Sequence, residues 1–257
     1  MDTSFRISPQ LSQMLGTAEA VCVLTGAGVS AESGVPTFRD ADGLWAKYNP
    51  YELATPQAFA ANPDLVWSWY SWRRERVAAV QPNAGHVALA GFVKMFPRFT
   101  LITQNVDNLH ARAGSPEVHE LHGNIEHSRC ASCSLPYHGD AAPRSSIAQR
   151  CSCGGWIRPG VVWFGESLPE REVLVAREAA ANCALFLSIG TSGQVYPAAE
   201  LPLIARHNGA YVVEINPEAS AISEHMHECI ALPSATVLPV LLDHTRALRN
   251  SSRSTSS

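Results

Sequence analysis

The sequence predicts an α/β protein built on a Rossmann-like, doubly wound parallel sheet, with a smaller inserted domain that is partly helical. Three observations lead to this prediction. Short, strongly apolar runs alternate along the chain with longer segments of helical pattern. Polar or glycine-containing turns follow the apolar runs, as they follow the strands of a parallel sheet. Two segments of different composition, 38–76 and 125–159, interrupt the alternation and supply the smaller domain.

The predicted strands are continuously apolar because helices cover both faces of a parallel sheet. They are residues 20–24, 99–102, 184–189 and 211–215. The segments predicted to be helical are residues 63–79, 84–95, 170–182 and 198–207. Ligands of such folds bind beyond the carboxyl ends of the strands, where this chain carries "TGAG", "TQNVDNLH", "GTSGQVYP" and "INPE".

The chain is expected to form one domain over residues 1–248, with a large and a small part that leave a cleft between them. The large part comprises about 1–37, 80–124 and 160–248, and the small part comprises the insertions, about 38–79 and 125–159. The last residues, "NSSRSTSS", are polar and lack an apolar anchor. We therefore expect residues 249–257 to be a disordered tail.

Composition excludes several classes of partner. The formal net charge is -4 and the isoelectric point is about 6.2, whereas nucleic-acid binders usually carry a basic surplus, so no direct nucleic-acid partner is expected. No apolar run approaches the roughly 20 residues of a membrane-spanning helix, and the start "MDTSFRISPQ" lacks a signal pattern. A cytoplasmic protein without a membrane partner is therefore expected. A monomer is compatible with the sequence, which leaves the oligomeric state open.

A glycine turn follows the first predicted strand, in "VCVLTGAGVSAESGVPTFR". Gly26 and Gly28 let the backbone turn tightly and approach a pyrophosphate, and a following helix presents free N–H groups to it. The turn departs from the dehydrogenase pattern, because Ala31 replaces the third glycine and Pro36 stops a long helix. The turn predicts a dinucleotide site, with a plain strand-to-helix connection as the alternative.

Four of the seven cysteines form two close pairs, Cys130 with Cys133 and Cys151 with Cys153. In a reducing compartment this grouping indicates a metal before disulfides, and four thiolates suit one structural zinc ion. Such a site has no open position for a catalytic water. Four free thiols on a loop are the alternative. The remaining cysteines lie in or near apolar runs and are expected in the core: Cys22, Cys183 and Cys229.

A longer set of motifs resembles the sirtuin family. "GAGVSAESGVPTFR", "TQNVDNLHARAG", "LHGN", "VVWFGE", "GTSGQVYP" and "IN" occur in the family's order and span about residues 21–242. One feature departs from the family pattern, because only Ser152 separates the last two cysteines and makes a tighter bite on a metal. The resemblance implies that NAD is a co-substrate: the enzyme splits its glycosidic bond and transfers an acyl group from lysine to ADP-ribose.

The resemblance also implies roles for single residues. His122, in "HGN", matches the family's catalytic histidine, and its ordinary pKa near 6.5 suits a general base. Asn105 and Asp107 are placed to bind the nicotinamide amide. Surface or core positions are expected for His110, His119 and His127.

The NAD contacts implied by the resemblance follow all four predicted strands. Many of them are also ordinary turn or helix-capping residue types, which is the alternative reading of the same positions. They are Gly26, Ala27, Gly28, Ser30, Ala31, Glu32, Thr37, Phe38, Arg39, Trp45, Gln104, Asn105, Val106, Asp107, Gly190, Thr191, Ser192, Asn216, Pro217, Glu218 and Ser234.

A further pair resembles the residues by which one sirtuin class recognises succinyl- and malonyl-lysine. Tyr70 and Arg73 are three residues apart, so a helix places them on one face, where a phenol and a guanidinium suit a carboxylate. An amphipathic helix with packed aromatics and solvated arginines is the alternative. The substrate is expected to pair with an extended segment and to contact Val161, Phe164, Gly165 and Glu166.

The predicted function is therefore an NAD-dependent protein-lysine deacylase with desuccinylase, demalonylase and deacetylase activity. Its partners are acylated-lysine proteins or peptides. Mono-ADP-ribosyl transfer shares the NAD chemistry and is the first alternative. An NAD-dependent dehydrogenase is disfavoured by the glycine turn, and a zinc-ribbon interaction module by the motifs outside the cysteine region.

Overall fold

The computed structural model describes residues 5–35, 49–137 and 147–254 of the chain. Its main feature is a six-stranded sheet in the order β3-β2-β1-β6-β7-β8, with every neighbouring pair parallel. The strands are β1 (Ala20–Thr25), β2 (Arg98–Thr103), β3 (His119–Glu120), β6 (Leu185–Ile189), β7 (Tyr211–Ile215) and β8 (Glu228–Ile230). The four predicted strands are confirmed. The two that the sequence did not reveal, β3 and β8, are short edge strands.

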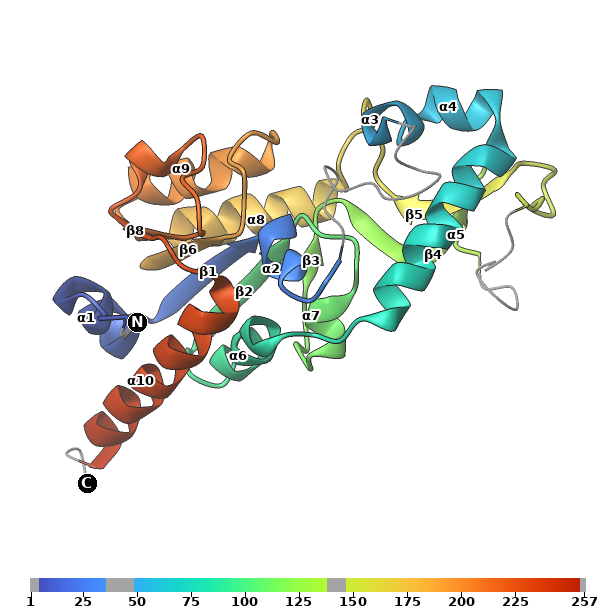
Figure 1. The fold of residues 1–257 in the computed structure, drawn as a ribbon. Helices are drawn as coiled ribbons and strands as arrows, with labels where there is room; N and C mark the ends of the chain where they lie inside the picture. The colour runs from blue at the N-terminus through green and yellow to red at the C-terminus, as the bar shows by residue number, and fades with distance from the viewer. Residues whose placement is uncertain (1–4, 36–48, 138–146, 255–257) are drawn as a thin grey trace.

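Two helical layers cover the sheet (Figure 1). On one face α1 (Pro9–Thr17), α6 (Ala84–Phe92) and α10 (Ser234–Ser254) pack on strand residues such as Val21 and Val23. On the other face α8 (Glu170–Asn182) and α9 (Leu201–His207) pack on Cys22 and Leu24. Successive side chains of a strand point to opposite faces, so each buried strand contributes to both cores. The doubly wound prediction is confirmed.

Helix ends follow the expected capping chemistry. The side chain of Ser8 caps α1 and that of Asn62 caps α5 (Pro63–Ala79), each ahead of a proline, which has no N–H and so needs no acceptor. Asn83 and His86 form a reciprocal capping box at the start of α6. The predicted helices over 63–79 and 170–182 coincide with α5 and α8, and the segment 198–207 divides into a 3-10 turn, η2 (Ala198–Glu200), and α9.

The end of the chain differs from the prediction of a disordered tail over 249–257. Helix α10 continues to Ser254, and only residues 255–257 lie outside the described part. Arg249 explains the difference, because its guanidinium donates to the carbonyls of Leu15 (3.0 Å) and Ala18 (2.6 Å) and lies 4.4 Å from the Phe96 ring centroid. These contacts anchor a stretch whose sequence has no apolar residue.

The two predicted insertions come together in one smaller body at the far end of the molecule (Figure 1). It contains α3 (Pro50–Leu53), α4 (Pro56–Ala61), α5 and an antiparallel pair, β4 (Gly123–Cys130) with β5 (Ile157–Val161). Helix α5 joins this pair through buried side chains: Trp67 Nε1 donates to the Ile157 carbonyl (2.7 Å) and Arg74 Nε to that of Ile125 (2.5 Å). The exact domain boundaries remain a prediction.

Three short helices complete the described chain: α2 (Ala27–Ala31), α7 (Leu109–Arg112) and the 3-10 turn η3 (Ser223–His225). None of the helices in the described ranges is long and apolar enough to cross a membrane.

Candidate active site

The chain reverses its winding direction between β1 and β6, and the site begins at their carboxyl ends. Gly26, Gly28 and Gly190 meet there. A Cβ on Gly26 would lie 2.7 Å from the Gly190 carbonyl oxygen, and one on Gly28 would lie 2.7 Å from the Gly190 Cα. Gly190 itself has a φ of +60°, a left-handed conformation that suits glycine. The glycines are therefore required by close contact between two loops, in addition to any approach of a ligand.

Asn105 follows β2 and ties the second loop to the first. Its Nδ2 donates to the Gly26 carbonyl (3.0 Å) and to Ser30 Oγ (3.0 Å), and its side chain is 9% exposed. Both amide hydrogens are used in this way, so Oδ1 is the group left to accept a hydrogen bond from a ligand. The Val106 carbonyl accepts from the Ile125 amide (2.8 Å), and its side chain packs against the core of the smaller body.

Asp107 caps α7 with a local hydrogen bond, as the turn alternative predicted. Its Oδ1 accepts from the Leu109 amide (2.9 Å), and Asn108 between them is left-handed with a φ of 63°. The carboxylate is also buried, and its charge favours the protonated form of the nearby His86. Asp107 thus binds the Leu109 amide in its own turn, and its charge acts on His86.

His122 lies between the sheet and the smaller body and is held in one tautomer. Its Nδ1 is 2.9 Å from the Gln104 carbonyl oxygen, which can only accept, so Nδ1 carries the proton and Nε2 has the free lone pair. Burial lowers the pKa of His122, while the hydrogen bond to Gln104 acts in the opposite direction. The imidazole is therefore neutral near pH 7 and can take up a proton at Nε2.

The next residue explains the "HG" pair in the sequence. Gly123 has a φ of +74°, and a Cβ there would lie 2.3 Å from the Gly160 carbonyl oxygen. The His122 carbonyl accepts from the Val162 amide (2.8 Å). The histidine is thus fixed on both sides by backbone, to β2 through Gln104 and to the segment after β5.

The carboxyl ends of β6 and β7 form a second edge of the site. Asn216 Nδ2 donates to the Thr191 carbonyl (3.0 Å), Thr191 Oγ1 lies 3.0 Å from Ser188 Oγ, and the Ser192 carbonyl accepts from the Ala221 amide (3.0 Å). The predicted residues of this edge lie together, and Pro217 and Glu218 beside them are exposed.

Two predicted NAD contacts, Glu32 and Ser234, bind each other in the structure, and their contact with NAD stays a prediction. Glu32 Oε1 accepts from the amide of Ser234 (2.8 Å) and from its Oγ (2.5 Å). Glu32 thus supplies the N-terminal cap of α10, where a negative charge is favourable. Ala27 and Ala31 are exposed on α2. Thr37, Phe38, Arg39 and Trp45 lie outside the described residues.

The predicted substrate segment is a tight turn after β5. The Glu166 amide donates to the Trp163 carbonyl (3.0 Å), and Gly165 has a φ of +86°. Phe164 is 42% exposed, whereas Val161 is buried. Because its N–H is used inside the turn, Glu166 can pair with an extended substrate only through its carbonyl.

The Glu166 side chain is half-buried and is bound by Arg158. The two guanidinium nitrogens donate at 2.5 and 2.9 Å, and Arg129 adds a charge at 3.7 Å. Burial opposes ionisation of Glu166, but the hydrogen bonds from Arg158 prevail and lower its pKa. A pocket of about 410 Å³ opens beside this turn and is lined by Glu166, Leu168, Leu174 and Tyr196 among others.

Tyr70 and Arg73 do lie on one face of α5. The Arg73 Cζ is 6.0 Å from the Tyr70 ring centroid and 5.0 Å from that of Trp69. The phenol is 2% exposed and its oxygen accepts from Trp163 Nε1 (2.9 Å). The Tyr70 phenol is therefore buried in the smaller body, whereas Arg73 is half-buried. Carboxylate binding by this pair stays a prediction.

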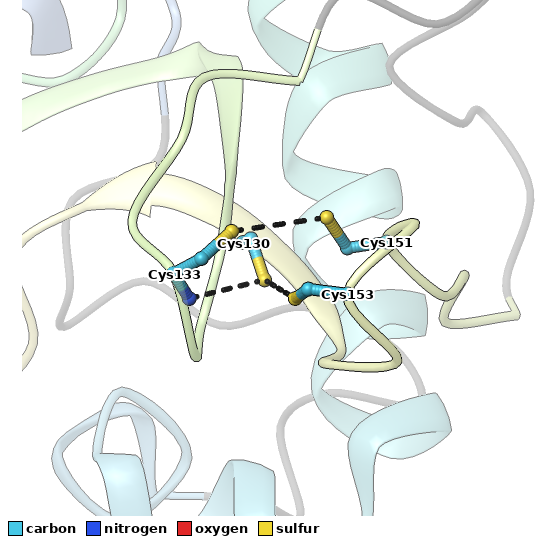
Figure 2. Close-up of side chains that lie close together, drawn as sticks. All are labelled: Cys130, Cys133, Cys151 and Cys153. Carbon is cyan, nitrogen blue, oxygen red and sulfur yellow. Dashed lines mark hydrogen bonds between the residues drawn. The ribbon is translucent and has the colours of Figure 1, made fainter.

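The four paired cysteines form one cluster (Figure 2). Cys130 comes from the end of β4, Cys133 from the turn after it, and Cys151 and Cys153 from the loop before β5. Their sulfur atoms all lie within 4.8 Å of one another, with Cys130 and Cys153 at 3.5 Å and Cys133 and Cys151 at 3.9 Å. Sulfurs bound to one tetrahedral zinc at about 2.3 Å have similar separations. The short Cys-x-Cys bite is thus compatible with one structural zinc ion.

Comparison with known proteins identifies the family. The Sir2 family profile matches residues 26–197. An NAD-dependent protein deacylase of Aquifex aeolicus is 51% identical over 227 residues, which cover 88% of this chain and 95% of the relative. The chain belongs to the Sir2 family. A solved Sir2 homologue in complex with NAD is 43% identical with a TM-score of 0.89, covering 95% of this chain and 96% of that one. A Sir2 structure with a deacetylated p53 peptide and 3'-O-acetyl ADP-ribose is 30% identical with a TM-score of 0.78, covering 91% and 96%.

The cysteine cluster lies in the smaller body of this Sir2 fold, away from the carboxyl ends of the six-stranded sheet. The cluster carries four possible thiolate ligands and lies in the smaller body, where Arg129 and Arg158 on the strands beside it bind Glu166. Zinc there would join the loop of Cys151 to β4 and would have no open coordination position for water.

Several buried residues next to the candidate site were not singled out as site residues from the sequence. Thr25, His86 and His110 form a buried polar group, in which Ser30 Oγ lies 3.5 Å from His86 Nε2, Thr25 Oγ1 lies 2.8 Å from His110 Nε2 and the two imidazole centroids are 4.8 Å apart. His110 thus has a core position, which is one of the two environments expected for it. Trp163 and Arg158 are the others. Trp163 lies in the motif "VVWFGE", which was a signal, but its partner Tyr70 is 93 residues away. Arg158 lies just before this motif and binds Glu166 within it.

Proposed function

We propose that this chain is an NAD-dependent protein-lysine deacylase in which His122 is the general base. The observation that carries the proposal is the free Nε2 of a neutral, backbone-held imidazole at the carboxyl ends of β2 and β3 in a Sir2 sheet. Membership in the Sir2 family and the name of the relatives support NAD as co-substrate. The same name does not favour mono-ADP-ribosyl transfer or hydride transfer.

The residues at the winding reversal suit the parts of NAD. The loop of Gly26 and Gly28 lies where a pyrophosphate is expected, and the edge of Thr191 and Asn216 lies where the adenosine ribose is expected. Asn105 Oδ1 would accept a hydrogen bond from the carboxamide of nicotinamide. When bound, NAD supplies the ribose carbon that receives the acyl oxygen as nicotinamide departs.

His122 then has one task. It takes a proton at Nε2 from a ribose hydroxyl, which makes that oxygen nucleophilic toward the acyl carbon, while Gln104 keeps Nδ1 protonated. The backbone bonds on both sides of His122 keep the ring in place as the proton moves. The acylated substrate would lie along the turn of Phe164 and Gly165, which is exposed.

We further propose that the acyl groups removed include succinyl and malonyl as well as acetyl. Tyr70 and Arg73 support this, because a buried hydroxyl and a cation side by side can hold a carboxylate. A protein or peptide partner follows from lysine as the acyl carrier. A reducing cytoplasm would keep the cysteine cluster available to zinc.

The test is direct. Purified protein is incubated with NAD and matched acetyl-, succinyl- and malonyl-lysine peptides, and the products are identified by mass. We expect nicotinamide release together with acylated ADP-ribose and free lysine peptide, in all three cases. ADP-ribosylated peptide would establish the alternative, and intact peptides with intact NAD would overturn the proposal.

A further inference from the structure

Tyr70 makes one hydrogen bond within the described residues, and it makes it as an acceptor. Trp163 Nε1 donates to the phenol oxygen at 2.9 Å. An indole N–H is a donor only, so the tyrosine hydroxyl hydrogen is directed elsewhere. Since the side chain is 2% exposed, that hydrogen faces the interior and not bulk water.

Trp163 is held so that it cannot easily turn this donor away. The Arg158 guanidinium carbon lies 3.3 Å from its ring centroid, and the Phe59 ring lies at 5.2 Å. The Trp163 amide donates to Glu166 Oε2 (2.8 Å), and Glu166 is paired with Arg158. The indole is thus fixed by stacking and its backbone by the same ion pair.

We propose that Trp163 is a positioning residue that determines acyl specificity through Tyr70. By occupying the accepting side of the phenol oxygen, it leaves Tyr70 to act as a donor beside the Arg73 cation. The pair then offers only donors, which favours acyl chains that end in an acceptor such as a carboxylate over chains that end in a methyl group. The inference rests on the proposed deacylase function and specifies its substrate class.

The charge state of Tyr70 is consistent with a donor role. Burial raises the pKa of Tyr70 to about 12, although Arg73 and the Trp163 hydrogen bond act to lower it. The phenol therefore keeps its proton at any pH at which the enzyme would be assayed. A neutral, buried hydroxyl and a half-buried guanidinium beside it would give a carboxylate charge-assisted hydrogen bonds.

The test uses Trp163→Phe, which removes the N–H and keeps an aromatic ring. We expect the ratio of kcat/KM for succinyl-lysine over acetyl-lysine peptide to fall about tenfold, mainly through KM, the effect of one such hydrogen bond. Trp67→Phe is the matched control, because Trp67 is also fully buried in the same core and donates its N–H, at 2.7 Å, to the Ile157 carbonyl. It should lower stability and leave the ratio unchanged.

A double-mutant comparison separates positioning from general damage. If Trp163 acts through Tyr70, the double variant Trp163→Phe with Tyr70→Phe has the same ratio as Tyr70→Phe alone. Additive losses, or an equal fall of the ratio in Trp67→Phe, would overturn the inference. So would a wild-type enzyme that removes acetyl groups but not succinyl groups.

A spectroscopic measurement keeps the inference distinct from the proposed function. Tyrosine labelled with ¹³C at Cζ reports the phenol without turnover. The Tyr70 resonance should move in Trp163→Phe and stay in place in Trp67→Phe. An unchanged Tyr70 resonance in Trp163→Phe would overturn the inference even if the protein is an active deacylase. A changed resonance in a protein that leaves all peptides intact would instead contradict the proposed function and support the Trp163 contact.

Discussion

We predict that the burial of His110 on α7 causes a measurable loss of stability in mild acid. Its side chain is 2% exposed, and within the described residues its Nδ1 has no hydrogen-bond partner. Burial lowers its pKa from 6.5 to about 3, with the charge of His86 as the smaller cause. Below pH 6.5 the unfolded chain therefore binds a proton that the folded chain does not, and the free energy of unfolding falls as the pH falls.

The magnitude follows from the two pKa values. Between about pH 7.5 and about pH 5.5 the unfolded imidazole becomes mostly protonated, while the folded one remains neutral. This difference lowers the free energy of unfolding by about 1.4 kcal/mol. His86 and His122, whose pKa values burial also lowers, act in the same direction, so the wild type should lose more than this amount.

His110→Gln isolates the contribution, because glutamine does not titrate and retains a donor for Thr25. Chemical denaturation is measured at both pH values and at the same zinc concentration. The decrease in the free energy of unfolding from the higher to the lower pH should be about 1.4 kcal/mol smaller in the variant than in the wild type. The fixed cost of the replacement cancels in this comparison. His127→Gln, at an exposed position, is the control and should match the wild type. An equal loss in His110→Gln and wild type would refute the reasoning.

The remaining predictions concern catalysis, specificity and metal. His122→Ala should bind NAD normally in calorimetry but lose acyl transfer by about two or more orders of magnitude; near-normal turnover contradicts its role. The wild-type kcat/KM should fall on the acid side below pH 6.5, because the base must be unprotonated and its pKa is lowered. Arg73→Met should reduce desuccinylation far more than deacetylation, and equal loss speaks against a carboxylate pocket. Metal analysis should find about one zinc per chain, lost in Cys133→Ser together with a lower Tm; a metal-free wild type excludes the site.

The sequence by itself determined the parts of this protein whose signal is local. Four strands were predicted from runs of apolar residues, and four helical segments from their residue pattern, because burial against a sheet imposes a pattern on residues that are neighbours in the sequence. The family motifs placed His122, Asn105 and the glycines at strand ends. The paired cysteines indicated a metal because a chelating spacing is also local.

Only the tertiary structure decided how these residues are used. His122 has a free Nε2 because the carbonyl of Gln104, in the turn after β2, accepts from Nδ1. The sequence could not show that the Glu166 carboxylate is bound by Arg158, or that Glu32 caps a helix that begins 202 residues later. The contacts expected of these two residues with substrate and with NAD stay predictions.

The hydrogen bond of Tyr70 is another contact that the sequence alone could not reveal. Its partner Trp163 is 93 residues away, and no spacing rule connects them. Hydrogen bonds and buried charges depend on which atoms the packed chain brings within about 3 Å, and that is decided by the whole core and not by any one segment.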